Sequence, residues 1–189
     1  WLRYESARLP FTVAETEKKT TASIAGLTLH LRLDRIDRLN DGSLLIIDYK
    51  TGDVSPNDWN LPRPGDVQLP LYADFALDAP PEQLGGLVFA KVRAGEVTFA
   101  GLMRDAKATL CSSLRGNTNL VKNPLDSEQI FEWKKHIEQL AVDFLSGRAA
   151  ADPREYPKTC KDCCLHALCR IQEKPPQPSD ENGEEAADA

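Results

Sequence analysis

Residues 29–52 read LHLRLDRIDRLNDGSLLIIDYKTG, an alternating strand, an Asn-Asp-Gly turn and a second strand that runs into Asp-Tyr-Lys. Asp48 and Lys50 point the same way, because side chains alternate with period two along a strand. Asp34 lies on the partner strand and comes within reach if the two strands pair through the turn. Two carboxylates and one ammonium at the edge of a sheet are typical of a divalent-metal site for phosphodiester cleavage.

An exposed salt bridge is the alternative explanation for Asp-x-Lys, which often occurs by chance. Against it, Asp48 follows four consecutive apolar residues, 44–47, and so lies at the border of a core. A charge in that position is costly and is usually kept for a reason.

A second polar pair follows in the sequence QLPLYA, on a helix expected over residues 66–77. Gln68 and Tyr72 are four residues apart and therefore share one helix face. Pro70 falls in the first turn, where its missing N–H is tolerated. An ordinary polar pair on an exposed helix face would look the same.

Together these three motifs resemble the RecB-like branch of the PD-(D/E)XK nucleases, which includes the nuclease domains of RecB and AddB. The pattern there is Gly-x-x-Asp, then Asp-x-Lys, then Gln-x-x-x-Tyr, and this chain departs from it only at Leu31, which replaces the glycine. The resemblance implies an α/β fold: a restriction-endonuclease-like mixed sheet with flanking helices and a cysteine-rich C-terminal segment. It also implies that this chain is the C-terminal part of a nuclease domain.

The resemblance further assigns roles to individual residues. Asp34 and Asp48 would bind Mg²⁺ or Mn²⁺, helped by the main-chain carbonyl of Tyr49, and Lys50 would orient or activate the attacking water. The remaining pair, Gln68 and Tyr72, would contact the DNA backbone or position the lysine.

Other acidic residues compete for the role of metal ligand. Asp37 has the opposite strand parity to Asp34, so only one of them faces the site; we favour Asp34. Glu15 and Glu17 on the preceding strand are weaker candidates, because charged strand residues usually face solvent.

Cysteines are concentrated in residues 160–169, TCKDCCLHALCR in context, a density that does not suggest disulfides in a chain without a signal peptide. The resemblance makes Cys160, Cys163 and Cys169 three ligands of a 4Fe–4S cluster in the full-length protein. Their fourth partner would lie far upstream, and no cysteine precedes residue 111. Cys164 is a local alternative ligand, and zinc or unligated thiols are alternative states.

Composition favours one domain: 189 residues are 41% hydrophobic and 28% charged. We expect the nuclease domain over residues 1–171, truncated at its N-terminus because Trp1 is no initiator and the upstream histidine of the family is missing. Residues 172–189 are expected to form a disordered acidic tail that carries most of the net charge of −6. No apolar run is long enough to span a membrane, and a cytoplasmic location is expected.

The remaining pattern predicts strands over 10–26, 27–39, 43–50, 84–92 and 96–102, an irregular loop over 51–65, and a helix over 126–146. Packing is the favoured role for Trp59 in that loop, ahead of base stacking. The apolar stripe of the last helix is predicted to be Ile130, Trp133, Ile137, Leu140 and Phe144. Candidate phosphate contacts are Arg32, Arg35, Arg38, Lys134, Lys135, Lys158 and Lys161.

These observations favour a metal-dependent deoxyribonuclease of recombination or repair, with exonuclease favoured over endonuclease. DNA is the expected substrate, and a helicase domain or subunit is an expected partner. One alternative is a catalytically incomplete DNA-binding or scaffolding module of the same fold. Another is a zinc-organised interaction domain.

Overall fold

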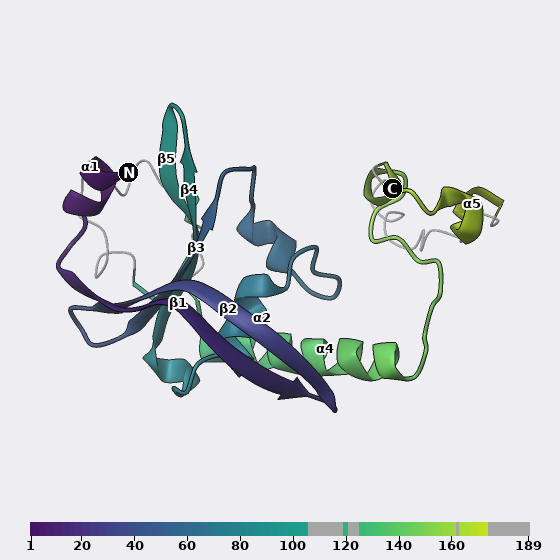
Figure 1. Ribbon diagram of the computed structural model, residues 1–189, viewed down its shortest axis with the longest axis horizontal. Helices are drawn as coiled ribbons and strands as arrows, with labels where there is room; N and C mark the ends of the chain where they lie inside the picture. The colour runs from purple at the N-terminus through teal and green to yellow at the C-terminus, as the bar shows by residue number, and fades with distance from the viewer. Residues whose placement is uncertain (106–118, 121–124, 162, 174–189) are drawn as a thin grey trace, which may run out of the picture. The chain divides into compact units, whose positions relative to one another are not determined.

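The computed structural model describes residues 1–105, 119–120, 125–161 and 163–173 (Figure 1). The chain divides into two compact units, Trp1–Arg148 and Ala149–Ala189. The sheet and the predicted nuclease motifs belong to the first unit, and the cysteine-rich segment to the second. Within the expected acidic tail, only residues 172 and 173 are described; the rest lies outside the described residues.

A mixed sheet forms the centre of the first unit, with six strands described, in the order β1-β2-β3-β4-β5-β6. The β1–β2, β2–β3 and β4–β5 pairs are antiparallel, whereas β3–β4 and β5–β6 are parallel. The strands are β1 Phe11–Ile24, β2 Leu27–Leu39, β3 Leu44–Lys50, β4 Leu84–Arg93, β5 Glu96–Met103 and β6 Asn119–Leu120. This mixed α/β sheet confirms the predicted fold class.

Among the described residues, the helices of the first unit are α1 Leu2–Ser6, α2 Gln68–Phe75 and α4 Ser127–Leu145, with 3-10 turns η1 Pro56–Trp59 and η2 Pro81–Gln83. The second unit holds η4 Lys158–Cys160, α5 His166–Cys169 and η5 Ile171–Glu173. A long helix needs caps, and α4 begins where the Asp126 carboxylate accepts a 2.6 Å hydrogen bond from the Gln129 N–H. It ends before Gly147, whose φ of +76° suits glycine. No helix in the described ranges is apolar over a length that could cross a membrane.

Both faces of β3 are buried, which explains its unbroken apolar run. Leu44 and Ile46 join the core formed with α2 and α4, while Leu45 and Ile47 join the core that contains Tyr4 of α1. A strand covered on both faces reads as a continuous hydrophobic stretch rather than an alternating one. By the same alternation, the residue after Ile47 faces α2.

The loop after β3 is attached to the core by Trp59, whose side chain is buried. Its ring packs 5.2 Å from that of Phe89 and 6.1 Å from that of Trp133, centroid to centroid. The Trp133 indole N–H donates to the Trp59 carbonyl oxygen at 3.0 Å. Trp59 is therefore a packing residue, as favoured above.

The predicted apolar stripe of α4 is wrong at its C-terminal end. Leu140 is 45% exposed and Phe144 73% exposed, and the buried position there is Ala141. Ala141 and Ile137 pack against the outer half of the β1–β2 hairpin, at Ala22 and Ile24 (Figure 1). The hairpin lies close to the helix at this point, so the small residue is buried and the large ones are not.

Candidate active site

The end of β3 presents an aspartate and a lysine toward α2. Asp48 is only 2% exposed, and its Oδ2 lies 2.6 Å from the Lys50 ammonium nitrogen. Register with β4 continues to the end of the strand, where Lys50 lies opposite Lys91. The parallel neighbour therefore keeps β3 extended and holds the two side chains on one face.

The first turn of α2 completes this arrangement through one amide group. Gln68 accepts a hydrogen bond from Lys50 Nζ on Oε1 at 2.8 Å, and it donates from Nε2 to Asp48 Oδ1, also at 2.8 Å. The same Nε2 lies 3.0 Å from the Tyr72 hydroxyl oxygen, and that hydroxyl donates to the Arg32 carbonyl oxygen at 2.9 Å. The predicted shared face of Gln68 and Tyr72 is therefore present, and it ties α2 to both strands.

Asp34 reaches the same region from β2. The β2–β3 register runs from Arg38 opposite Leu44 to Arg35 opposite Ile47, so it ends just before Asp48. Beyond that point, the Asp34 carboxylate accepts a 3.0 Å hydrogen bond from the Tyr49 N–H. The Asp34 side chain thus joins β2 to β3 just beyond the last paired residues of the two strands.

The electrostatics of the site are set by carboxylates in excess of cations. Burial is the largest effect on Asp48 and raises the pKa of its carboxyl group. The negative charges of Asp34 and Asp66 raise that pKa further, and the nearby Lys50 ammonium opposes the change. One lysine therefore faces three acidic groups.

This environment suits a hard divalent cation. Asp48 Oδ2 is buried and accepts no hydrogen bond of ordinary geometry from the described part of the chain, although Lys50 lies at ion-pair distance. Carboxylate and carbonyl oxygens are the ligands that Mg²⁺ and Mn²⁺ prefer. No three His, Cys, Asp or Glu side chains gather as a metal site among the described residues. The predicted set, two carboxylates and the Tyr49 carbonyl, needs only two such side chains.

The competing acidic residues are engaged elsewhere. Asp37 is fully buried on the opposite face of the sheet and forms ion pairs with Arg8 and Arg35. Glu15 pairs with Lys18, and Glu17 pairs with Arg32. Arg35 itself is buried, which removes it from the candidate phosphate contacts.

Asp66 is a site residue that sequence reasoning missed. Its Oδ1 accepts a 2.7 Å hydrogen bond from the Gln68 N–H at the start of α2, and its charge acts on Asp48. The available signal was an aspartate at the first residue of the predicted helix, a position from which a carboxylate commonly accepts from free N–H groups.

The cysteine-rich segment is described by itself. Cys160, Cys163, Cys164 and Cys169 are free thiols, and the second and third of these are exposed. The His166 ring nitrogen Nε2 lies 2.6 Å from the Cys160 carbonyl oxygen, and the Leu165 N–H lies 3.4 Å from Cys163 Sγ. Because the thiols do not converge on one point in the described residues, cluster or zinc ligation stays a prediction. Cys111 lies outside the described residues.

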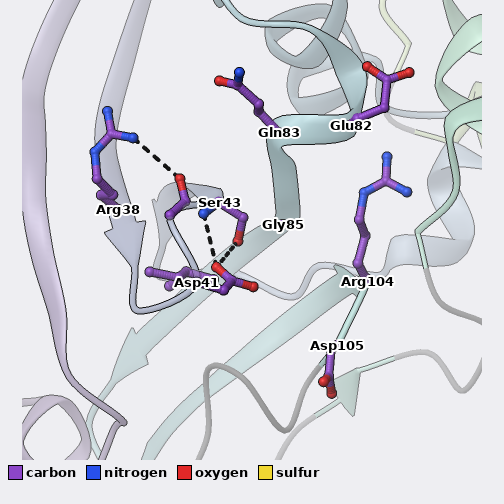
Figure 2. A pocket seen from close by; sticks show the side chains of 10 residues that line it. Arg38, Asp41, Ser43, Glu82, Gln83, Gly85, Arg104 and Asp105 are labelled. Carbon is purple, nitrogen blue, oxygen red and sulfur yellow. Dashed lines mark hydrogen bonds between the residues drawn. The ribbon is translucent and has the colours of Figure 1, made fainter.

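A separate pocket of about 470 Å³ lies near the start of β3, at the other end of that strand from Asp48 (Figure 2). Two of its polar groups are already engaged. Asp41 accepts hydrogen bonds from the backbone and the hydroxyl of Ser43, and Arg104 donates to the carbonyl oxygens of Leu84 and Pro81. It shares no residue with the site around Asp48.

A family model described as the PD-(D/E)XK nuclease superfamily matches residues 1–170. No curated protein matches the chain. A solved structure described as "Crystal structure of SSO0001" is similar at 19% identity and a TM-score of 0.42, over 82% of this chain and 59% of that one. The chain thus spans under two thirds of that protein.

Proposed function

The chain belongs to the PD-(D/E)XK nuclease superfamily, and on that premise we propose that it hydrolyses DNA phosphodiester bonds with the help of Mg²⁺ or Mn²⁺. One observation carries the proposal. Asp48, Lys50 and Gln68 meet in a single hydrogen-bonded group on one face of the sheet, with Asp34 joined to the same strand end.

Lys50 supplies a positive charge at the candidate site. Its side chain is 30% exposed, so it is accessible to substrate while Asp48 and Gln68 fix its position. A compact positive charge held in advance stabilises the negative charge that develops on the phosphate in the transition state. Because its partners are already in place, little reorganisation is needed when the substrate arrives.

Gln68 and Tyr72 act in this proposal as positioning residues. The amide of Gln68 uses its oxygen for the lysine and its nitrogen for Asp48, which fixes the amide orientation. Tyr72 anchors that amide to the backbone of β2 through Arg32. Their bonds to protein groups favour positioning over direct contact with the DNA backbone.

The cation would be held by Asp34, Asp48 and the Tyr49 carbonyl oxygen. When bound, a hard divalent cation neutralises phosphate charge and lowers the pKa of water. The carboxylates supply the negative charge it needs, and Lys50 complements it from the same strand.

Cleavage of single- and double-stranded DNA with and without Mg²⁺ or Mn²⁺ tests the proposal. We expect cation-dependent cleavage by the wild type and a loss of at least about 10²-fold in kcat for Lys50→Met, because one preorganised charge is removed. Lys18→Met is the matched control, since Lys18 also lies on a strand and pairs with a carboxylate at 2.7 Å. Cleavage that needs no cation, or equal rates for the two variants, would overturn the assignment.

Finer assignments belong to the same proposal and are supported by the motif resemblance alone. They are exonucleolytic cutting in DNA recombination or repair, a helicase partner, a cytoplasmic location, and a 4Fe–4S cluster on Cys160, Cys163 and Cys169. Anaerobic purification tests the last of these, because an iron–sulfur protein is brown and a zinc protein is colourless. Product lengths from end-labelled DNA separate stepwise from internal cutting.

A further inference from the structure

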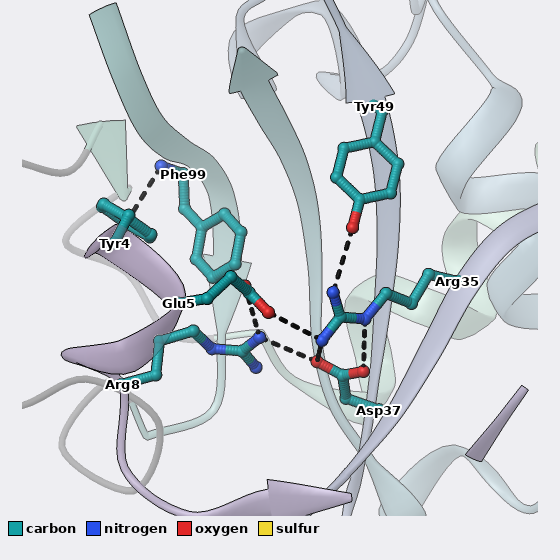
Figure 3. A network of polar contacts seen from close by, with 7 residues as sticks. All are labelled: Tyr4, Glu5, Arg8, Arg35, Asp37, Tyr49 and Phe99. Atoms are coloured by element: carbon teal, nitrogen blue, oxygen red, sulfur yellow. Dashed lines mark hydrogen bonds and ion pairs between the residues drawn. The ribbon is translucent and has the colours of Figure 1, made fainter. Parts of the chain in front are cut away.

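The back of the sheet carries a polar network directly behind the candidate active site (Figure 3). This back-face network consists of Glu5, Arg8, Arg35, Asp37 and Tyr49. Its members come from α1, the following segment, β2 and β3. Tyr49 connects it to the site, because this residue stands between Asp48 and Lys50 with its side chain on the opposite face.

Arg35 is the centre of the network. Its guanidinium donates from Nε and Nη2 to the two carboxylate oxygens of Asp37, at 2.6 and 3.0 Å. Nη2 also donates to Glu5 of α1 at 2.9 Å, and Nη1 donates to the Tyr49 hydroxyl at 3.0 Å. A planar guanidinium with both sides occupied has one orientation available, so it presents Nη1 to Tyr49 from a fixed point.

Tyr49 is thus held on both faces of the sheet by neighbouring residues of β2. On the front, the Asp34 carboxylate accepts from its backbone N–H; on the back, Arg35 binds its hydroxyl. The Tyr49 ring also packs edge-on against Trp1, with centroids 5.5 Å apart. These contacts act where the β2–β3 register has already ended, at Arg35 opposite Ile47.

From this geometry we infer that Arg35 is a positioning residue of the active site, which acts through the Tyr49 hydroxyl to fix the backbone between Asp48 and Lys50. Glu5 of α1 and Asp37 orient Arg35, so the N-terminal helix contributes to the site without touching it. The inference rests on the proposed nuclease function for its catalytic consequence. The mechanical part, the restraint of β3 by Arg35, stands on the contacts alone.

Tyr49→Phe is the direct test, because it removes one hydroxyl and keeps the ring that packs on Trp1. We expect kcat on DNA to fall about ten-fold while KM for DNA stays within about two-fold, since the reacting groups are misplaced but the DNA surface is intact. In the metal-free protein, hydrogen exchange of the backbone amides at residues 48–50 should become about ten-fold faster.

Tyr4→Phe is the matched control. The Tyr4 hydroxyl lies in the same layer and accepts a hydrogen bond from the Phe99 N–H at 3.2 Å, away from the end of β3. This variant should lose stability without changing kcat per folded molecule or exchange at residues 48–50. If Tyr49→Phe fails to fold, Glu5→Gln serves instead, because it weakens the contact that orients Arg35. It must also lower kcat and speed hydrogen exchange at residues 48–50, each by a smaller factor.

The two readouts separate the possible failures. If the wild type does not cut DNA, the proposed function fails, and amide exchange still decides whether Arg35 restrains β3. If the wild type cuts, an unchanged kcat or unchanged exchange in Tyr49→Phe overturns the positioning role. An equal effect of Tyr4→Phe on kcat would overturn it as well, because the loss would then be general loosening.

Discussion

The two faces of the sheet at β3 both hold buried carboxylates, but among the described residues only the back face carries as many cations as carboxylates. On the back face, Asp37 accepts hydrogen bonds from Nε and Nη2 of Arg35 and a 2.8 Å bond from Arg8. On the front face, Asp48 shares a single lysine with other acidic groups, and burial raises the pKa of its carboxyl group. A carboxylate whose charge is matched inside the protein supports the fold, whereas an unmatched one awaits a cation from outside.

Asp48→Asn tests the difference between the two faces with the largest expected effect. We expect cleavage to fall by at least about 10³-fold, because a proposed metal ligand is lost. Stability should not fall, since the change removes a buried charge whose ionised form is already disfavoured. Thermal unfolding with Mg²⁺ at about 100 times its Kd should stabilise the wild type by about 2.7 kcal/mol and the variant by much less. Equal stabilisation of both proteins would count against metal binding by Asp48.

Asp37→Asn should show the opposite pattern, a large loss of stability and a small loss of cleavage. Removing this carboxylate leaves the buried guanidinium groups of Arg8 and Arg35 with only Glu5 of the two carboxylates that they share, and breaking a buried ion pair in this way typically costs about 3–5 kcal/mol. Urea unfolding measures that loss directly. Cleavage per folded molecule should fall far less than in Asp48→Asn. A variant as stable as the wild type would show that the network contributes little to the fold.

Asp74 on α2 offers a third carboxyl group for comparison: it lies outside the candidate site and has no arginine partner among the described residues. Burial raises its pKa to about 7; the charge of Lys134 lowers it, and that of Glu138 raises it. The folded protein therefore binds a proton more tightly than the unfolded chain, so stability should decline as pH rises from about 4 to about 7.

Asp74→Asn should remove that decline and be more stable than the wild type at pH 8. Because the group is only partly buried, we expect a gain of about 1–2 kcal/mol. Urea unfolding at pH 5 and pH 8 checks it. A gain that is equal at both pH values would mean that ionisation of Asp74 is not its cause.

Much of the front face could be predicted because its determinants are local. Strand parity places Asp48 and Lys50 together, and four-residue helical spacing places Gln68 beside Tyr72. The proximity of Asp34 to Asp48 could be predicted because one short turn joins their two strands. Each of these inferences needs only the period of a single element or one hairpin.

The back face could not be predicted, because the contacts that tie α1 and the segment after it to β2 join residues that are far apart in sequence. Arg35 looks like an exposed arginine of an alternating strand until α1 covers it with Glu5. In α4, hydrophobicity favoured Phe144 over Ala141 for burial, but the distance to the hairpin decides that question. Whether a residue is buried in these places depends on which surface lies opposite it. Sequence periodicity does not specify that surface.

The hydrogen bond between the Asp34 carboxylate and the Tyr49 N–H has a consequence for reading mutational scans of such sites. Asp34→Ala removes a candidate metal ligand and also the hydrogen bond that joins β2 to β3. A loss of activity in this variant therefore combines a catalytic effect with a structural one. Asparagine retains an oxygen that can accept from the same N–H. The difference between the two replacements, rather than either alone, isolates what the negative charge contributes.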